Sequence, residues 1–464
     1  MKPLADDRLP HDKLAPRRAW PGFRGVIVAL LFAVSFVLFV DRINITVAAP
    51  FLKQEFGFSD ANLGEVLGAF MLGYAMGLVP GGWLADRFGP WRVLTGAGLS
   101  WAVLTVLMGL TRTELFGLTL DPRTTLIVAR FLLGLCEACA YPTFSRALAN
   151  WVRRSERASA MGLIQAGSGL GGAVTPVIIA AIISHWGWRE SFLISGMLTF
   201  VVALAWWAIA ADHPAEHRRV RKEELEIILQ DREESRALPP DLRWYRRLLA
   251  SRDFYLLCTS QFLFGVAGFV FYSWFFTYFK EQRGAEPRYA AVLSSLTFLS
   301  LAIGALAGGL LCDRCMKRWG APWGRRTVPL LAITFGGLCG LIAPILPNNT
   351  ASAAVFALTA GVLYLAASGF WSTAIDLTRR GTGILGGLMN AANWLGAALA
   401  TIAFPRLVPE LGWERTLQGA GLAGILSGLV WLAIDSSRQI DIPVASPLDS
   451  PDAVPRFQNG TSRL

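Results

Sequence analysis

Residues 23–40 read FRGVIVALLFAVSFVLFV, and an aspartate and an arginine follow at once in VDRINITV, residues 40–47. The apolar run is long enough to cross the hydrocarbon core of a bilayer, which takes a helix of about 20 residues. In lipid, backbone polar groups must be paired within their own segment, so the run predicts a membrane-spanning helix. Asp41 and Arg42 near its outer end need a reason, because a charge at the bilayer centre costs about 3 kcal/mol.

Apolar runs of similar length recur along the whole chain. Of the 464 residues, 53% are hydrophobic and 16% are charged, whereas a soluble domain carries about 25% charged residues. The alternation typical of barrel strands is absent. We therefore predict an all-α integral membrane protein with twelve transmembrane helices. The spans are expected at 25–48, 61–84, 91–111, 124–150, 157–184, 189–211, 253–279, 287–312, 326–346, 351–377, 380–405 and 414–435.

The net charge of +10 is unevenly distributed. If the N-terminus is cytoplasmic, 31 of the 43 lysines and arginines fall in inner segments, chiefly the tail 1–24, the linker 212–252 and the loop 313–326, while the tail 436–464 adds three. This asymmetry follows the positive-inside rule and predicts that both termini are cytoplasmic. Because topology explains the basic charge, we expect no nucleic-acid partner. The polar N-terminus and the length of the first apolar run argue against a signal peptide.

Two pairs of cysteines, Cys136 with Cys139 and Cys312 with Cys315, have the C-x-x-C spacing. This spacing occurs in metal and redox sites. Both pairs, however, lie at or inside predicted membrane helices, where a free cysteine behaves as a small hydrophobic residue. We therefore expect no metal and no cofactor.

The two halves of the chain resemble each other. Three motifs recur at an offset of 225 to 227 residues: GGWLADR (81–87) as GGLLCDR (308–314), QAGSGLG (165–171) as NAANWLG (390–396), and GWRESF (187–192) as GWERTL (412–417). The offset predicts two six-helix bundles of the same orientation, at 25–211 and 253–435. Such parallel repeats are typical of transporters that bind their substrate between the halves.

Four charged residues stand out within predicted helices: Asp41 and Arg42 in the first, and Arg130 and Glu137 in the fourth. Their counterparts in the second half, at an offset of 225, are uncharged: Val266, Ala267, Val355 and Val362. If the first helix leaves the membrane near Pro50, Asp41 lies about 13 Å deep and Arg130 about 9 Å deep. We therefore predict that Asp41 pairs with Arg130.

The four charges suggest a proton-dependent anion site. They sum to zero, so protonation of Asp41 or Glu137 leaves a net positive cluster that suits an incoming anion. Arg42 diverges from Asp41 by about 100° around the helix, and it offers a planar fork for a carboxylate or phosphate. The alternative is a permanent ionic network that only holds the two helices together.

Further polar and aromatic residues are candidates to line a substrate cavity. Gln165 and Asn390 occupy equivalent positions in the two halves, and their amides can bind hydroxyl groups. The remaining candidates are Tyr74, Ser368, Trp371, Trp274 and Tyr278. The alternative for the amides and for Tyr74 is hydrogen bonding between helices, and for the aromatic residues of the second half it is packing or anchoring at the membrane surface.

The segment GGWLADRFGPWR resembles the signature of the second loop in the major facilitator superfamily. VDRINITVAAPFL and ARFLLGLCEACAYPTFSRALANWVRRSERASAMG resemble its anion:cation symporter branch, as does the central DHPAEHRR, and the resemblance covers residues 20–440. It implies that Asp41, Arg130 and Glu137 handle the proton, while Arg42, Tyr74, Gln165 and Asn390 contact the substrate. It also implies an inner gate at Asp86, Arg87 and Arg92, whose alternative role is to end a helix at the membrane surface.

The expected function is therefore proton-coupled import of a small organic anion, such as a sugar acid, by a monomer in the inner membrane. One alternative is an anion exchanger or drug exporter on the same fold. A membrane-bound enzyme or sensor is a third possibility. The four histidines all lie near or outside the predicted membrane boundaries, and no H-E-x-x-H, G-x-S-x-G or P-loop pattern occurs. We therefore expect no enzymatic activity.

Overall fold

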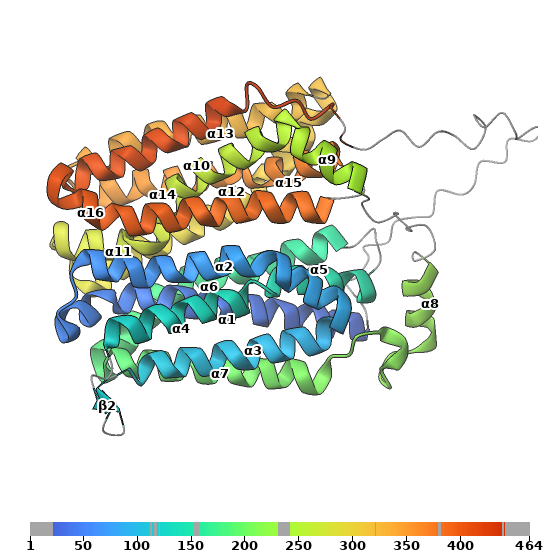
Figure 1. Cartoon of the computed structure of the whole chain (residues 1–464), viewed down its shortest axis with the longest axis horizontal. Coiled ribbons are helices and arrows are strands. Elements are labelled where there is room, and N and C mark those ends of the chain that lie inside the picture. The colour runs from blue at the N-terminus through green and yellow to red at the C-terminus, as the bar shows by residue number, and fades with distance from the viewer. Residues whose placement is uncertain are drawn as a thin grey trace, which may run out of the picture. The chain divides into compact units, whose positions relative to one another are not determined.

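The computed structural model is built almost entirely of helices (Figure 1). It describes residues 22–111, 114–115, 118–119, 121–152, 157–230, 242–320, 322–378, 382–438 and 440. Most of the two predicted cytoplasmic tails, and residues 231–241 of the predicted linker, lie outside the described residues.

The described helices form two compact units, within each of which long helices run side by side (Figure 1). The first unit contains α1 Phe23–Phe56, α2 Asp60–Phe88, α3 Pro90–Gly109, α4 Pro122–Glu137, α5 Ala140–Trp151, α6 Arg157–Trp186, α7 Trp188–Ile209, the short η2 Pro214–Glu216 and α8 Lys222–Gln230. A small antiparallel hairpin, β1 Glu114–Leu115 and β2 Leu118–Thr119, joins α3 to α4.

The second unit contains α9 Leu242–Ala250, α10 Arg252–Ser273, α11 Phe275–Thr277, the π-helical turn η3 Tyr278–Gln282, α13 Trp323–Ile342, η4 Ala343–Ile345, α14 Asn349–Leu365, α15 Ala367–Leu377 and α16 Thr382–Val430. Helix α12, Pro287–Trp319, contributes residues up to 299 to the first unit and the rest to the second.

The predicted class of a twelve-span helical membrane protein is confirmed. Within the described residues, eleven helices are long and apolar enough to cross a membrane. One of them, α16, is 49 residues long and contains Gly412 with φ 78° and ψ 163°, values that no α-helix contains. The chain turns at this glycine, so α16 holds two of the predicted spans.

Glycines bring α2 and α4 into backbone contact. A Cβ atom at Gly73 would clash with the carbonyl oxygen of Phe131, and Gly134 lies in the same crossing. Glycines also allow close backbone contact between α12 and α14, because a Cβ atom at Gly304 would clash with the carbonyl oxygen of Gly361. Gly134 and Gly361 are 227 residues apart, the offset of the sequence repeat. Close approach of α2 and α4 brings the charged face of α4 against α2.

The predicted fourth span is broken into two helices. Helix α4 ends at Glu137 and α5 begins at Ala140. Pro142 explains the break, because its ring collides with the carbonyl group four residues earlier, that of Ala138, and it lacks a backbone N–H. Glu137 therefore stands at the last position of a helix, next to a turn in the middle of the span.

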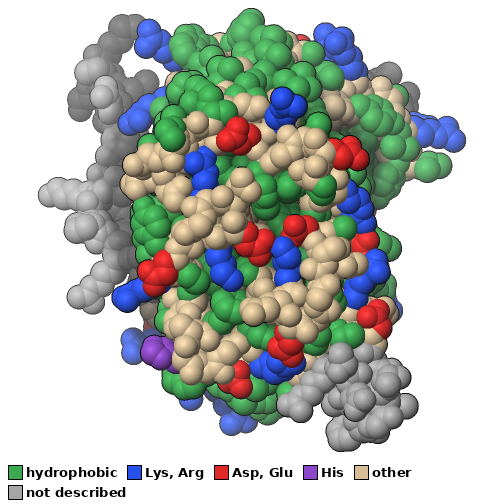
Figure 2. Space-filling model, turned by 90° about the vertical axis from the view of Figure 1, so that its left-hand side faces the viewer, with side chains coloured by type: hydrophobic (Ala, Val, Ile, Leu, Met, Phe, Trp, Pro, Cys, Tyr) green, Lys and Arg blue, Asp and Glu red, His purple; other side chains and the backbone are tan. Residues whose placement is uncertain are grey.

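Charged side chains pair at the helix ends. In the first unit, Lys53 binds Asp60 at 2.6 Å, and the Arg189 Nη1 atom donates to Glu55 at 2.7 Å. Figure 2 shows acidic and basic side chains intermingled over one end of the molecule. Mixed charge at helix ends is expected where a membrane protein meets water.

Two helices of the first unit are capped by carboxylates from the segment that follows α7. Helices α1 and α3 start after Gly22 and Gly89, which have positive φ and supply no capping side chain. Glu224 of α8 accepts hydrogen bonds from the backbone N–H groups of Phe23 and Arg24, at 3.0 and 2.8 Å.

Asp212 serves α3 in the same way, accepting from the backbone N–H of Trp91 at 2.8 Å. Each carboxylate also interacts favourably with the positive end of the helix dipole. Asp212, just after α7, and Glu224, in α8, thereby hold the starts of α3 and α1, although both glycines are more than a hundred residues away in sequence.

We expect Glu224→Ala to destabilise the protein by about 1 kcal/mol, the typical value of an N-terminal cap, and to lower its melting temperature by about 2 °C. Glu223→Ala is the matched control, because Glu223 lies beside it on α8 but is exposed. Thermal unfolding of both variants in detergent measures the difference. Equal shifts in the two variants would show that the cap contributes nothing.

Candidate functional site

A buried ion pair joins α1 to α4. The Nε atom of Arg42 donates to Oε2 of Glu137 at 2.6 Å, and the two side chains are 6% and 0% exposed. The guanidinium carbon of Arg42 also lies 4.6 Å from the centroid of the Tyr74 ring on α2. The pair is thus enclosed by three helices of the first unit, where a low dielectric strengthens each electrostatic contact.

The predicted Asp41–Arg130 pair is wrong. Helix α1 continues through Pro50 to Phe56, so Asp41 lies about 22 Å from its outer end rather than 13 Å. Glu137 lies about 22 Å from the start of α4 at Pro122, and is therefore level with residues 41 and 42. The predicted depth was counted from Pro50, but Pro50 lies inside α1, because a proline in a membrane helix need not end it.

Asp41 instead turns toward α7. Its Oδ2 atom accepts a hydrogen bond from the hydroxyl of Thr199 at 2.7 Å. One helical turn along α1, Asn44 donates to Ser195 at 2.9 Å and accepts from Ser191 at 2.8 Å. The Oδ1 atom of Asp41 has no hydrogen-bond partner among the described residues.

Sequence reasoning missed the three hydroxyl residues of α7. Ser191, Ser195 and Thr199 recur every four residues in an otherwise apolar span, which places them on one face of the helix. That spacing is a signal that could have identified them. They form a polar seam that anchors the charged part of α1 to α7.

Arg130 is buried, and few polar groups are placed to bind its guanidinium group. Its guanidinium carbon lies 4.4 Å from the centroid of the Phe70 ring, at cation–π distance. Among the described residues, its Nε and Nη1 atoms have no hydrogen-bond partner, and neither has Oε1 of Glu137. Unsatisfied buried polar atoms are rare in native proteins and mark a place where water or a ligand binds.

The other polar candidates are distributed over both units. Gln165 is exposed on α6 of the first unit. In the second unit, Asn390 on α16 and Ser368 on α15 are half-buried. The ring of Trp371, also on α15, is exposed, and its edge rests against Gly386. These positions leave all four side chains accessible to some degree.

Trp274 and Tyr278 make packing contacts within the protein. Packing was the alternative to lining a substrate cavity. Trp274 and Tyr278 are each about 1% exposed. The indole N–H of Trp274 donates to the backbone carbonyl of Thr401 at 3.2 Å. The Tyr278 hydroxyl accepts from Nε of Arg283 at 2.7 Å. Trp274 also stands between α10 and α11, and its ring stacks on that of Phe404 at a centroid distance of 6.1 Å.

The predicted gate residues lie at the α2–α3 turn. Asp86 is mostly exposed and forms a loose ion pair with Arg146, with an N–O distance of 3.7 Å. The Arg87 guanidinium lies 5.9 Å from the Trp83 ring centroid, and Arg92 is exposed. These contacts are all within the first unit, and the role as a gate stays a prediction.

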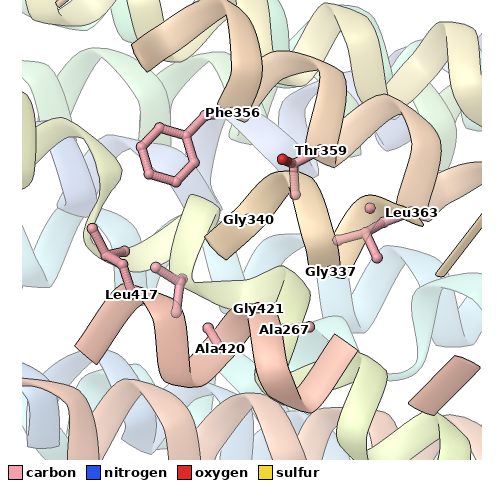
Figure 3. Close-up of a pocket in the computed structure, with 11 residues that line it drawn as sticks. Ala267, Gly337, Gly340, Phe356, Thr359, Leu363, Leu417, Ala420 and Gly421 are labelled. Atoms are coloured by element: carbon pink, nitrogen blue, oxygen red, sulfur yellow. The ribbon is translucent and has the colours of Figure 1, made fainter. Parts of the chain in front are cut away.

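A pocket in the second unit is lined without charged residues. It is formed by α10, α13, α14 and α16 (Figure 3), and its cavity volume of about 10 Å³ leaves room for about one water molecule. Glycines and apolar side chains line it, and the one hydroxyl, that of Thr359, donates to the carbonyl of Val355 in its own helix. The pocket therefore offers nothing that would bind an anion.

The cysteines and acidic residues give no sign of a metal site. All six cysteines are free. Within the described part of the chain, no group of three histidine, cysteine, aspartate or glutamate side chains is placed to hold a metal ion. The chemistry of the site therefore rests on its arginines, carboxyl groups and hydroxyls.

Comparisons with known proteins agree on one family. A family model described as Major Facilitator Superfamily matches residues 31–401. The probable sulfoacetate transporter SauU of Cupriavidus necator is 32% identical over 92% of this chain and 96% of its own. The probable galactarate/D-glucarate transporter GudP of Escherichia coli is 26% identical over 90% and 95%.

Solved structures share the fold. A bacterial homologue of the human lysosomal transporter Spinster, in an inward-facing and unoccupied conformation, superposes with a TM-score of 0.71 at 18% identity. The match covers 90% of this chain and 97% of that one. The helical arrangement is therefore shared even where the sequences have diverged.

Proposed function

The chain belongs to the Major Facilitator Superfamily, and we propose that within it this protein imports a small organic anion together with protons. Membership makes the chain a multi-pass membrane transporter and not an enzyme. The proposal concerns its cargo, the coupling ion and the direction of transport.

The buried pair of Arg42 and Glu137 carries the proposal. Arginine offers a planar fork of donors that matches a carboxylate, a sulfonate or a phosphate. In the structure a carboxylate of the protein itself, that of Glu137, accepts from one donor of that fork, Nε, at 2.6 Å. An anionic substrate that reaches Arg42 would compete with Glu137 for the same donors.

Protonation of Glu137 resolves this competition. A neutral carboxyl group binds a guanidinium far more weakly than a carboxylate does, so a proton on Glu137 releases Arg42 to the substrate. Loss of the proton restores the internal pair and expels the anion. Proton and anion are thereby bound and released together, which is the requirement for symport.

The chemistry of the cargo follows from the site and from the relatives. SauU is named for sulfoacetate and GudP for galactarate and D-glucarate, all of which are small anions at neutral pH. The hydroxyl of Tyr74 and the amides of Gln165 and Asn390 are proposed to bind polar groups of the substrate. Ser368 and Trp371 are proposed as further contacts.

The remaining charges complete the proposed cycle. Asp41 and Arg130 are proposed to tune the proton site, since both interact electrostatically with Glu137. Asp86, Arg87 and Arg92 are proposed to close the inner side as the two bundles alternate in access. The excess of basic residues in the segments predicted to be inner supports a cytoplasmic location for both termini, and the inner membrane is the proposed location.

Uptake into proteoliposomes tests the function. We expect radiolabelled sulfoacetate, galactarate or a related organic anion to accumulate when the outside is made acidic, because inward proton flow then drives import. One coupled proton per monoanion supports about tenfold accumulation per pH unit. Uptake that ignores the pH gradient but requires an anion trapped inside would identify an exchanger instead.

A further inference from the structure

Helix α9 presents three distinct faces. Trp244 and Leu248, four residues apart, are 3% and 1% exposed. Leu242, Tyr245 and Leu249 fall on a second face and are 69%, 41% and 59% exposed. The arginines lie on a third face, at positions 243, 246 and 247. With about 100° between successive residues, the apolar and basic stripes lie side by side on the uncovered part of the helix.

The buried face fixes α9 to the second unit. The indole N–H of Trp244 donates to the hydroxyl of Thr378 at 3.0 Å, just after the end of α15. Figure 1 shows α9 at the same end of this unit as α15. The helix is therefore held in a defined orientation, and its exposed leucines are not a consequence of a loose segment.

The position of α9 points to the membrane surface. Ser251 alone separates α9 from α10, a membrane-spanning helix that begins at Arg252, and the Ser251 hydroxyl caps that helix. Tyr255, in the first turns of α10, is 53% exposed, and tyrosine is enriched where a span meets the headgroups. The exposed stripe of α9 thus starts where the chain enters the lipid.

Charge identifies the partner. Residues 242–250 contain three arginines and no acidic residue. Among the described residues, none of these arginines forms an ion pair. An apolar stripe beside a basic stripe is the pattern of helices that lie in the plane of a membrane, and the arginine fork matches a lipid phosphate.

We propose that α9 docks on the anionic phospholipids of the inner leaflet, with Leu242, Tyr245 and Leu249 in the headgroup boundary and Arg243, Arg246 and Arg247 on the phosphates. The assignment to the inner leaflet rests on the proposed orientation of the transporter. Each basic residue near an anionic surface strengthens binding about fivefold, and salt screens the effect. The lipid would hold the segment that leads into α10.

Hydrogen exchange of the full-length protein in nanodiscs tests the proposal. The amides of residues 242–250 are followed in discs of phosphatidylcholine alone and in discs that also contain phosphatidylglycerol. We expect exchange to slow by about fivefold or more in the anionic discs, and the difference to shrink at high salt. The triple variant Arg243→Gln, Arg246→Gln, Arg247→Gln should lose the difference, while glutamine preserves the helix.

A matched triple variant controls for net charge. Arg218, Arg219 and Arg221 are exposed arginines in the segment before α8, and their change to glutamine should leave the protection of α9 intact. Equal exchange of the wild-type helix in both kinds of disc would overturn the proposal. So would protection that appears only when two copies share a disc, which would assign the face to a second copy. None of these readouts needs transport, so failure here and failure of the proposed function are distinguishable.

Discussion

Arg42→Lys should reduce anion uptake roughly 10- to 100-fold while leaving the protein folded. Arg42 is held by Glu137 and lies over the Tyr74 ring, so a lysine at this position keeps a positive charge beside the carboxylate. It loses the planar pair of donors that a carboxylate or sulfonate requires. Hydrogen bonds to charged groups are worth about 1.5 to 3 kcal/mol each, which gives the expected range for one lost bond.

Initial rates of uptake into proteoliposomes measure this effect, and a melting curve of the purified variant checks that it is folded. Arg123→Lys is the matched control. Arg123 donates to Glu65 at 2.9 Å near the start of α4, so the same substitution there should change neither rate nor stability appreciably. Wild-type uptake by Arg42→Lys would remove Arg42 from the substrate site.

The spans and the four buried charges could be predicted from the sequence because both are local properties. An apolar run of sufficient length must be helical in lipid, and a charge inside it stands out without knowledge of its neighbours. Which of those charges pair with one another could not be predicted from the sequence. It depends on where α1 ends, and the end at Phe56 rather than Pro50 shifts Asp41 by about 9 Å in depth.

Long-range contacts were the least predictable part. Gly22 and Gly89 give no local sign of a cap, since the carboxylates that serve α1 and α3 come from Glu224 and Asp212, far along the chain. The aromatic pair Trp274 and Tyr278 illustrates the same limit. From the sequence, each ring could either line a cavity or pack inside the protein. The hydrogen bonds from Trp274 to Thr401 and from Arg283 to Tyr278 favour packing.

Glu137→Gln should uncouple transport from the proton gradient without stopping exchange. The glutamine has the shape of the protonated carboxyl group and carries no charge, so Arg42 is permanently available to the anion. We expect counterflow, in which labelled anion exchanges for unlabelled anion trapped inside, to continue at a rate similar to that of the wild type. Accumulation driven by an acidic exterior should fall from about tenfold per pH unit to none.

The same pair of assays separates Glu137 from its neighbours. Glu65→Gln, which removes a carboxylate that pairs with Arg123 near the start of α4, should behave as the wild type in both assays. Asp41→Asn tests the other buried carboxyl group, whose Oδ2 atom is held by Thr199. If Glu137→Gln still concentrates the anion and Asp41→Asn does not, the transported proton resides on Asp41, and the ion pair with Arg42 serves substrate binding alone. If both variants concentrate it, the cargo moves without a proton from either group, and competition between Glu137 and the anion for Arg42 is not the mechanism of coupling.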